Sequence, residues 1–216
     1  MPRGNKQELP TLGLGKGAQT ARGLRRRTVI LKVAATLFAE HGFDSVSINQ
    51  IGDEAGITGP AIYRYFPSKE ALLVAIYEHL YQRSSDGINE VLLEGLNGRD
   101  ALVRLIDLQL HLAVEEREKV RIVEREERHL PVKEAAELQA EARKQVRVWT
   151  GFIREARPDL GRDEGDSTVH AVLALINSIA LKRLGETVPR SVCAHLRAMA
   201  LAAVFQSVGD VSVPTT

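Results

Sequence analysis

The segment from Ser47 to Lys69 constrains the fold more than any other feature, because a glycine turn separates two short apolar stretches. Ser47 and Gln50 have the spacing of a capping box, in which the two residues cap the start of a helix reciprocally. Gly56 is placed to end that helix after about two turns, since glycine readily adopts the left-handed conformation. Pro60 fits only in the first turn of a further helix. The pattern predicts two short helices joined by a tight turn.

The chain on either side predicts two more helices. Apolar residues recur with the 3.6-residue period of one helix face at Ile30, Val33, Ala34, Leu37 and Phe38. Gly42 is expected to end that helix, and Ser68, after the chain-breaking Pro67, is expected to cap the next one. Two helices joined in this way form a helix-turn-helix, which places its second helix in the DNA major groove.

The second short helix is expected to present the surface that contacts DNA. Ile62 and Phe66 should face the core, which leaves outward or at the helix start Gly59, Pro60, Ala61, Tyr63 and Arg64. Small residues there let the backbone approach the groove. The hydroxyl of Tyr63 can bond a phosphate, or its ring can pack on a thymine methyl, and Arg64 can pair with guanine or phosphate. Tyr65 is expected to be partly core.

Positive charge gathers around this motif. Residues 1–69 carry ten Lys and Arg against five Asp and Glu, whereas the rest of the chain carries 19 against 23; this distribution suits phosphate binding. Lys69, in a first helical turn, is expected to contact a docked phosphate; the alternative is a cation merely tolerated against the helix dipole. The upstream arginines are expected either to form an arm that touches DNA or to begin a solvated helix: Arg22, Arg25, Arg26 and Arg27.

From Arg27 to Leu80 the chain resembles the N-terminal domain of the tetracycline-repressor (TetR/AcrR) family. The resemblance rests on LFAEHGFDSVSINQIGDEAGI at 37–57 and GPAIYRYFPSKEALL at 59–73. It implies DNA contacts, mostly with the backbone, by Ser47, Thr58, Gly59, Pro60, Tyr63, Tyr65 and Lys69. Tyr65, after Arg64, stands where the family often has His, so base preference does not transfer. The family implies homodimers that leave palindromic operators when a small molecule enters the C-terminal domain.

Nearly all of the chain after Pro67 is predicted to be helical, so the expected fold is all-α. The expected helices are 68–84, 86–95, 100–117, 119–129, 133–156, 166–184 and 188–208. The expected organisation is a disordered tail at 1–21, a helix-turn-helix domain at 22–67, a linking helix at 68–84, a ligand-binding and dimerisation domain at 85–208 and a tail at 209–216.

A ligand site is expected among these later helices. The charged run from Glu115 to Arg128 is typical of a solvated helix face; the alternative is that Glu116 and Glu127 point inward and bind a polar end of a ligand. The resemblance implies that the helix at 133–156 walls a cavity, so Trp149 and Phe152 are candidate lining residues, with plain core as the alternative. The 5% aromatic content favours an apolar or acyl-chain ligand.

The last two helices are expected to form the dimer interface that the resemblance implies, an ordinary monomeric core being the alternative. Asn177 and Ser178 interrupt the apolar run between Val169 and Leu181, either as register-fixing polar residues or as pocket donors. The expected interface residues are Val172, Leu175, Ile179, Leu196, Met199 and Phe205.

Other classes of protein find no support in the sequence. The single cysteine, Cys193, permits no intrachain disulfide, as expected in the cytoplasm. No signal peptide is expected, and the most apolar run, 171–181, is too short to cross a bilayer. Catalytic and cofactor motifs are absent, so neither an enzyme nor a cofactor is expected. The spacing of Glu124, Glu127 and His129 matches no named metal motif.

The sequence therefore predicts a homodimeric DNA-binding repressor, released from a palindromic operator by a small apolar effector. Two alternatives remain. One is an activator or a regulator that is ligand-independent or controlled by a partner protein. The other is a helical scaffold that does not bind DNA, which would leave the exposed tyrosine and basic residues of the motif unexplained.

Overall fold

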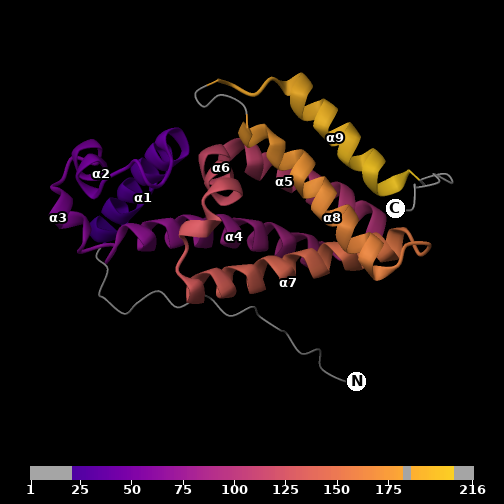
Figure 1. The fold of residues 1–216 in the computed structure, drawn as a ribbon. Coiled ribbons are helices and arrows are strands. Elements are labelled where there is room, and N and C mark those ends of the chain that lie inside the picture. Colours follow the sequence, from indigo (N-terminus) through magenta and orange to yellow (C-terminus); the bar gives the residue numbers. More distant parts are fainter. Residues whose placement is uncertain (1–20, 182–185, 207–216) are drawn as a thin grey trace, which may run out of the picture.

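The computed structural model describes residues 21–181 and 186–206, and these residues contain helices but no strand, which confirms the predicted all-α class. Figure 1 shows the arrangement. The α-helices are α1 (Ala21–His41), α2 (Ile48–Glu54), α3 (Gly59–Ile62), α4 (Lys69–Glu94), α5 (Gly98–Glu115), α6 (Arg117–Arg125), α7 (Val132–Ala156), α8 (Arg162–Asn177) and α9 (Arg190–Phe205). Two 3₁₀ turns, η1 (Glu127–His129) and η2 (Ser178–Leu181), follow α6 and α8. The predicted tails lie outside the described residues, apart from Ala21, which begins α1.

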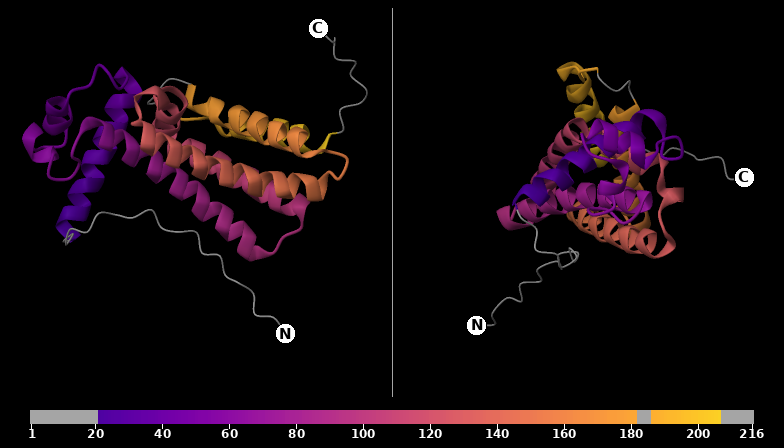
Figure 2. Two further views of the ribbon diagram at one scale, coloured as in Figure 1. Left: turned by 60° about the horizontal axis from the view of Figure 1, so that its bottom comes forward. Right: turned by 90° about the vertical axis from the view of Figure 1, so that its left-hand side faces the viewer.

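The molecule has an N-terminal group of three helices and a larger group formed by α5 to α9, with α4 running through both (Figure 1). Figure 2 shows α1, α2 and α3 together at one end of the molecule. Their core contains Ile30, Phe38, Ile51 and Phe66, and it also takes in Ile122 of α6. The N-terminal helices are therefore packed directly on α6.

A second apolar core holds the C-terminal helices together. Leu105 and Ile106 of α5, Ile153 of α7 and Val172 of α8 are fully or almost fully buried in it, and Val204 joins it from α9. Helices α8 and α9 lie side by side over α5 (Figure 1). The predicted helix–loop pattern is confirmed for the helices at 133–156 and 188–208, to within three residues at either end.

Three helix predictions are wrong in their bounds. The expected break at residue 85 does not exist, since α4 is continuous and Ser85 is buried inside it, where its hydroxyl donates to Glu141 Oε1 at 3.2 Å. The helix expected at 119–129 ends at Arg125 and continues as η1. The helix expected at 166–184 begins at Arg162, because Gly165 packs inside it against Thr150, and it tightens into η2 after Asn177.

The glycine turns of the N-terminal group have the predicted conformation. Gly42 has φ 81° and Gly56 has φ 66°, both in the left-handed region that favours glycine. The capping box is also confirmed: Ser47 Oγ accepts from the Gln50 amide at 3.2 Å, and the Ser47 amide donates to Gln50 Oε1 at 2.8 Å. Ser68 caps α4 by accepting from the Ala71 amide at 3.1 Å.

Candidate DNA-binding surface and effector cavity

The two helices of the motif pack backbone to backbone. A Cβ atom on Gly52 of α2 would lie 2.8 Å from both the Gly59 nitrogen and the Ile57 carbonyl oxygen. Gly59 itself is buried against Asn49, whose Oδ1 is 2.0 Å from the position of an added Cβ. Gly59 lies at the start of α3, one of the two places expected for it, and it is buried there because it makes room for α2. Sequence reasoning missed Gly52, whose role depends on a partner in the next helix.

The remaining residues of this segment divide as predicted into a buried and an exposed set. Ile62 and Phe66 are 0% and 2% exposed, whereas the side chain of Tyr63 is 53% exposed. Also exposed are Thr58, Pro60 and Arg64, while Ala61 and Tyr65 are half-buried. Tyr65 packs against the N-terminal core, which confirms that it is partly core. The exposed set forms one surface, made by α3 and the turn that follows it.

The upstream arginines are part of α1 rather than a separate arm. Arg26 Nη1 donates to the Ala55 carbonyl at 3.1 Å, which ties α1 to the end of α2. The guanidinium of Arg27 lies 4.6 Å from the centroid of the Phe66 ring. Arg25 is exposed on the same helix. Of the two alternatives, the helix start is the one the structure contains.

A basic recess lies between α1 and α3. It has a volume of about 380 Å³ and is lined by Arg22, Arg26 and Arg64, together with Ala61 and Tyr65. Three arginines line it, two from α1 and Arg64 from the turn that follows α3. A recess of this size and charge is suited to a phosphate group of a nucleic-acid backbone.

Lys69 is bound within the protein. Its ammonium group donates to the carbonyl oxygens of Phe43 at 2.9 Å and Val46 at 3.1 Å, and it lies 4.3 Å from the centroid of the Phe43 ring. The lysine therefore fixes the loop between α1 and α2 from the first turn of α4. Two of the three N–H donors of Lys69 are therefore already used within the protein, and at most one is left for the DNA phosphate that was expected as its partner.

Replacing Lys69 with methionine is expected to destabilise the protein even without DNA. The apolar stem remains, but two charge-assisted hydrogen bonds and a cation–π contact are lost, at a cost of about 2–3 kcal/mol. Thermal unfolding of the free protein measures this effect. The control is Arg64→Met on the exposed surface, for which we expect an unchanged midpoint. A Lys69→Met protein with the wild-type midpoint would show that the loop does not depend on this lysine.

A cavity of about 430 Å³ lies between α4, α5, α6, α7 and α8. Its apolar wall includes Leu112, Val120, Val123, Val146, Trp149 and Leu173. A short hydrogen-bonded chain forms its polar side: Gln109 Nε2 donates to Asn177 Oδ1 at 3.1 Å, and Asn177 Nδ2 donates to Glu124 Oε1 at 2.9 Å. Trp149 and Asn177 therefore lie at the cavity, as expected of ligand-binding residues.

Three other expected ligand residues lie elsewhere. Glu127 is exposed and accepts from Gln139 Nε2 at 2.7 Å, because the helix of the charged run ends at Arg125 and η1 turns Glu127 away. Phe152 packs into the C-terminal core. Glu116 lies at the junction of α5 and α6 and is not part of the cavity lining. Glu124 takes the position at the cavity that was expected for Glu127.

Glu116 is the centre of an ion cluster at that junction. Its carboxylate accepts from His79 Nε2 at 2.9 Å and pairs with Lys119, and Arg83 Nη1 lies 3.6 Å away. Burial alone would raise the pKa of Glu116, but the hydrogen bonds from His79 and Lys119 outweigh it and lower the pKa from 4.5 to about 2. The charged form of this carboxylate therefore stabilises the fold.

Glu116→Gln is expected to lower the free energy of unfolding by about 1–3 kcal/mol at pH 7, since it leaves the cations around it unpaired. The pKa in the folded state is below the ordinary value, so the advantage of the wild type is complete above about pH 5 and disappears as the pH falls toward 2. Denaturant unfolding at a series of pH values measures the difference. The control is Glu115→Gln, whose side chain is 45% exposed and for which we expect an effect under about 1 kcal/mol. A difference that stays constant with pH would contradict this role.

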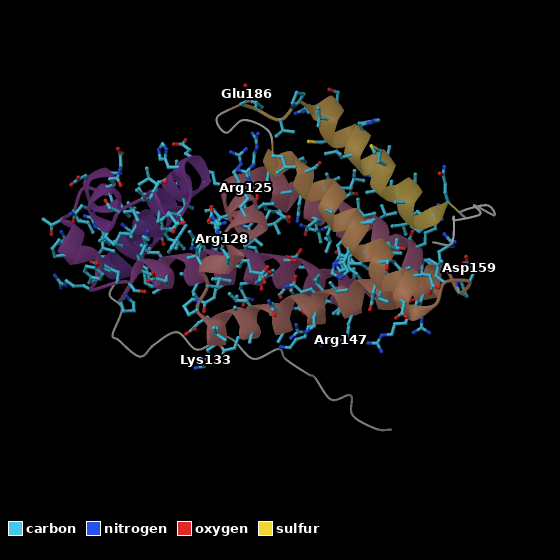
Figure 3. All side chains as sticks on the ribbon, in the orientation of Figure 1. Arg125, Arg128, Lys133, Arg147, Asp159 and Glu186 are labelled. Atoms are coloured by element: carbon cyan, nitrogen blue, oxygen red, sulfur yellow. The ribbon has the colours of Figure 1, made fainter. Side chains whose placement is uncertain are left out.

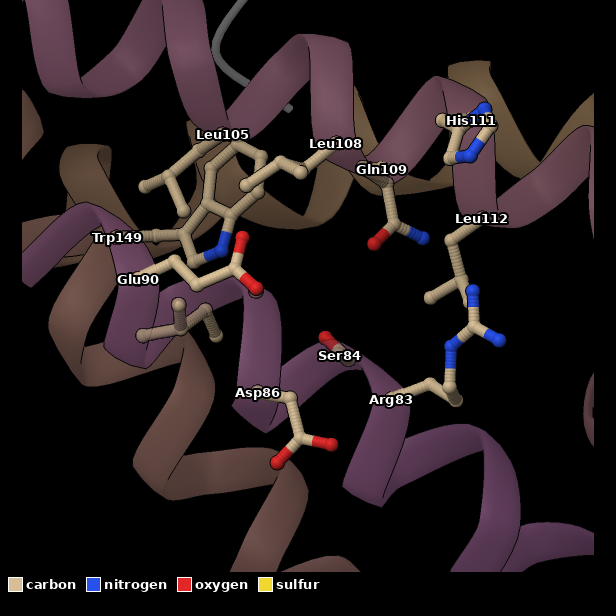
Figure 4. Close-up of a pocket in the computed structure, with 12 residues that line it drawn as sticks. Arg83, Ser84, Asp86, Glu90, Leu105, Leu108, Gln109, His111, Leu112 and Trp149 are labelled. Atoms are coloured by element: carbon tan, nitrogen blue, oxygen red, sulfur yellow. The ribbon is translucent and has the colours of Figure 1, made fainter.

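A second recess adjoins the cavity on the outer side of α4 and α5. It has a volume of about 350 Å³ and shares Ser84, Gln109, Leu112 and Trp149 with the cavity. Figure 4 shows Glu90 and Trp149 toward one side of this recess and Arg83 toward the other. Trp149 is 3% exposed and lines both spaces.

Helix α6 touches both the cavity and the N-terminal helices. Val120, Val123 and Glu124 line the cavity, while the Val123 carbonyl accepts from the hydroxyl of Tyr77 at 3.1 Å. After α6, the ring of His129 lies 4.8 Å from that of Phe43, in the loop held by Lys69. Figure 3 shows Arg125 and Arg128 along this contact region.

The other end of α6 is bonded to the end of α8. Arg117 Nε donates to the Ile179 carbonyl at 3.2 Å, and Arg121 Nε donates to the Ala180 carbonyl at 2.7 Å. These bonds satisfy carbonyl groups of η2, where the helix has run out of amide donors. A shift of α6 would therefore be felt by both α8 and the N-terminal helices.

The expected interface residues of the last two helices divide into two groups. Val172 and Ile179 are 0% and 1% exposed within the single chain, so they are core residues and their assignment to an interface was wrong. Met199 is 43% exposed, and three other expected interface residues are half-buried: Leu175, Leu196 and Phe205. Asn177 lies at the cavity, whereas the Ser178 hydroxyl donates to the Leu175 carbonyl of its own helix at 2.6 Å.

Within the described residues, no three His, Cys, Asp or Glu side chains are grouped so that they could hold a metal ion. A search of the same residues for a helix long and apolar enough to cross a membrane found none.

Comparison with known proteins identifies a family match over the helix-turn-helix region of the chain. The family described as "Bacterial regulatory proteins, tetR family" matches residues 30–76. The transcriptional repressor KstR2 of Rhodococcus jostii is 30% identical over 135 residues, which cover 62% of this chain and 66% of the repressor. The chain thus spans just under two thirds of that relative, and 26% and 45% of two other curated relatives, the Bacillus subtilis regulators YuxN and YdgC.

Solved structures share the fold over nearly their whole length. The ketosteroid transcriptional regulator KstR2 of Mycobacterium tuberculosis has a TM-score of 0.70 at 21% identity, over 84% of this chain and 96% of that one. AibR, solved with isovaleryl coenzyme A and operator DNA, has a TM-score of 0.71 at 17% identity, over 83% and 98%. The named relatives are transcriptional regulators, a class without enzymatic activity. Residues 30–76 therefore form a helix-turn-helix domain of the tetR family of bacterial regulatory proteins, and the chain as a whole is similar to transcriptional regulators in sequence and in fold.

Proposed function

We propose that this protein is a homodimeric, cytoplasmic transcriptional repressor that binds a palindromic operator and leaves it when a small molecule occupies the cavity. The observation that carries the proposal is the surface of α3. There Tyr63 is 53% exposed next to a recess lined by Arg22, Arg26 and Arg64. An exposed tyrosine beside three guanidinium groups suits base contact and phosphate contact at one groove of DNA.

The dimer is proposed from the outer face of α8 and α9. Met199 is 43% exposed on it, and Leu175, Leu196 and Phe205 are each half-buried. A four-helix bundle formed with the same two helices of a second copy would cover these side chains. The two recognition helices would then enter successive major grooves about 34–36 Å apart, which requires an operator with twofold symmetry.

Control by a ligand is proposed from the position of α6. Helix α6 lines the cavity through Val120, Val123 and Glu124 and packs on the N-terminal core through Ile122. The turn η1 that follows it contacts the loop before α2, where the ring of His129 lies against that of Phe43. A ligand that fits one position of α6 better than another changes the population of DNA-binding arrangements by its difference in affinity for the two. AibR, which has this fold, was solved with isovaleryl coenzyme A and operator DNA.

A salt titration of binding to the DNA upstream of the protein's own gene, against scrambled competitor, tests the proposal. We expect sequence-selective binding whose affinity falls steeply with salt, two chains per operator by sedimentation, and loss of binding with compounds that raise the unfolding midpoint. Weak, unselective binding to this DNA and to other candidate operators would contradict the proposal. Selective binding that no stabilising compound alters would favour the ligand-independent or partner-controlled regulator instead.

A further inference from the structure

The charged side chains that line the cavity do not suit an acidic ligand. None of the described residues that line it is a lysine or an arginine. Glu124 is its carboxylate, and the other polar side chains carry hydroxyl, amide or imidazole groups, among them Tyr81, Gln145 and His170. One oxygen of Glu124 accepts from Asn177, and its Oε2 accepts no hydrogen bond from another described residue. Among the residues that the structure describes, the cavity therefore has a carboxylate oxygen to offer and no lysine or arginine in its lining.

We propose that the cavity selects an organic cation with an apolar body, such as an arylalkyl amine. The ammonium group would lie against Glu124 Oε2, and the apolar body would lie against Trp149 and the aliphatic wall. This inference rests on the proposed function only in identifying the cavity as the effector site, and it narrows the apolar or acyl ligand expected from the sequence. Glu124 is exposed at the edge of the cavity, and a carboxylate in the same place would be repelled by its like charge, with no lysine or arginine among the described lining residues to offset it.

The outer recess has the same sign of charge. Asp86 and Glu90 line it together with Arg83, whose guanidinium is already paired with Glu115 at 3.0 Å and is 3.6 Å from Glu116. Glu90 and Trp149 both line this recess. A recess with a carboxylate and an indole ring in its lining is a favourable environment for a cation, since the ring face attracts positive charge. Both spaces that Trp149 lines therefore favour a positively charged group.

The pKa of Tyr81 is raised in part by the carboxylates near the cavity. Burial, followed by the carboxylates of Glu127 and Glu124, raises the pKa of the Tyr81 hydroxyl to about 12. This hydroxyl is therefore neutral at pH 7. It adds a hydrogen-bonding group to the wall but no charge that would oppose a bound cation.

Three probes of nearly equal size test the preference: 4-phenylbutan-1-amine, 4-phenylbutan-1-ol and 4-phenylbutanoate. Trp149 is the only tryptophan of the chain, so its fluorescence reports on the cavity wall directly in the free full-length protein. We expect the amine to bind about tenfold more tightly than the alcohol, and the carboxylate to bind more weakly still. A carboxylate that binds as tightly as the amine would overturn the inference, as would the absence of any fluorescence response to all three probes at millimolar concentration.

Two matched variants test whether the carboxylate of Glu124 sets the preference for the amine. Glu124→Gln keeps the size of the side chain and is expected to reduce the advantage of the amine over the alcohol to within about threefold. Glu127→Gln makes the same change in charge three residues along the chain, where the side chain is exposed and bonded to Gln139. In that variant the tenfold preference should persist. Equal preferences in the two variants would show that the carboxylate at the cavity does not set the selectivity.

The inference and the proposed function fail separately, because the fluorescence measurement contains no DNA. If the amine binds with the expected preference but leaves operator affinity unchanged, ligand control of DNA binding is wrong and the preference of the cavity stands. If an anionic compound binds next to Trp149 and releases the operator, the proposed function stands and the preference for a cation is wrong.

Discussion

Replacing Tyr63 with alanine is expected to lower the affinity for the specific operator about a hundredfold, while unspecific binding changes little. A good side-chain contact to a base edge is worth about 1–3 kcal/mol, and a symmetric dimer loses it at both half-sites, so about tenfold is lost at each. The side chain is 53% exposed, so its removal leaves the N-terminal core intact. Competition binding with specific and scrambled DNA at one salt concentration measures the effect.

Tyr63→Phe separates the two contacts that a tyrosine offers. If the ring packs on a thymine methyl, the phenylalanine variant retains most of the affinity; if the hydroxyl bonds a phosphate, it behaves like alanine. Leu93→Ala is the control for a change at an exposed side chain, since Leu93 is 87% exposed near the far end of α4. Equal specific affinity in the wild type and Tyr63→Ala would remove α3 from the recognition surface.

Gly52→Ala is expected to destabilise the N-terminal helices by about 3 kcal/mol or more. The added Cβ would be 2.8 Å from two backbone atoms, the nitrogen of Gly59 and the carbonyl oxygen of Ile57. Backbone atoms cannot move aside as the end of a side chain can, so α2 and α3 must separate and their shared packing is lost. For a chain of this length each kcal/mol lowers the midpoint by about 2–4 °C, which gives a fall of about 6–12 °C in thermal unfolding.

Gly151→Ala is the matched control, because this glycine also lies in a helix but has nothing within 4 Å of an added Cβ. In that position alanine is expected to stabilise the protein by about 0.5–1 kcal/mol, through the lower entropy of the unfolded chain. The two identical substitutions should thus have opposite signs. A Gly52→Ala protein as stable as the wild type would show that the contact between α2 and α3 is looser than described.

The sequence was most informative where structure depends on neighbours in the chain. The capping box of Ser47 and Gln50, the cap at Ser68 and the left-handed turn at Gly56 depend on residues a few positions apart, and all three are confirmed. The bounds of later helices were less predictable. The two helices expected at 68–84 and 86–95 are one continuous helix, in which a hydrogen bond to Glu141 of α7 satisfies the hydroxyl of Ser85.

The roles of individual site residues depended on contacts that periodicity does not encode. Lys69 bonds to carbonyl groups 23 and 26 residues away. The choice between Glu124 and Glu127 depended on where α6 ends, since one extra turn of helix would have changed which carboxylate faces the cavity. Val172 shows a further limit: a fully apolar helix has the same pattern whether it is buried in its own subunit or in a dimer.

The unbroken course of α4 has a mechanical consequence. Its 26 residues make a rod about 39 Å long, at about 1.5 Å per residue. A break at residue 85, between the helices expected at 68–84 and 86–95, would have absorbed motion at one end before it reached the other. Without a hinge, a pivot of about 3° moves the tip by about 2 Å over that length. In a dimer with twofold symmetry the two tips move in opposite senses, so a displacement too small to disturb either core becomes a mismatch of about 4 Å against the fixed pitch of the double helix.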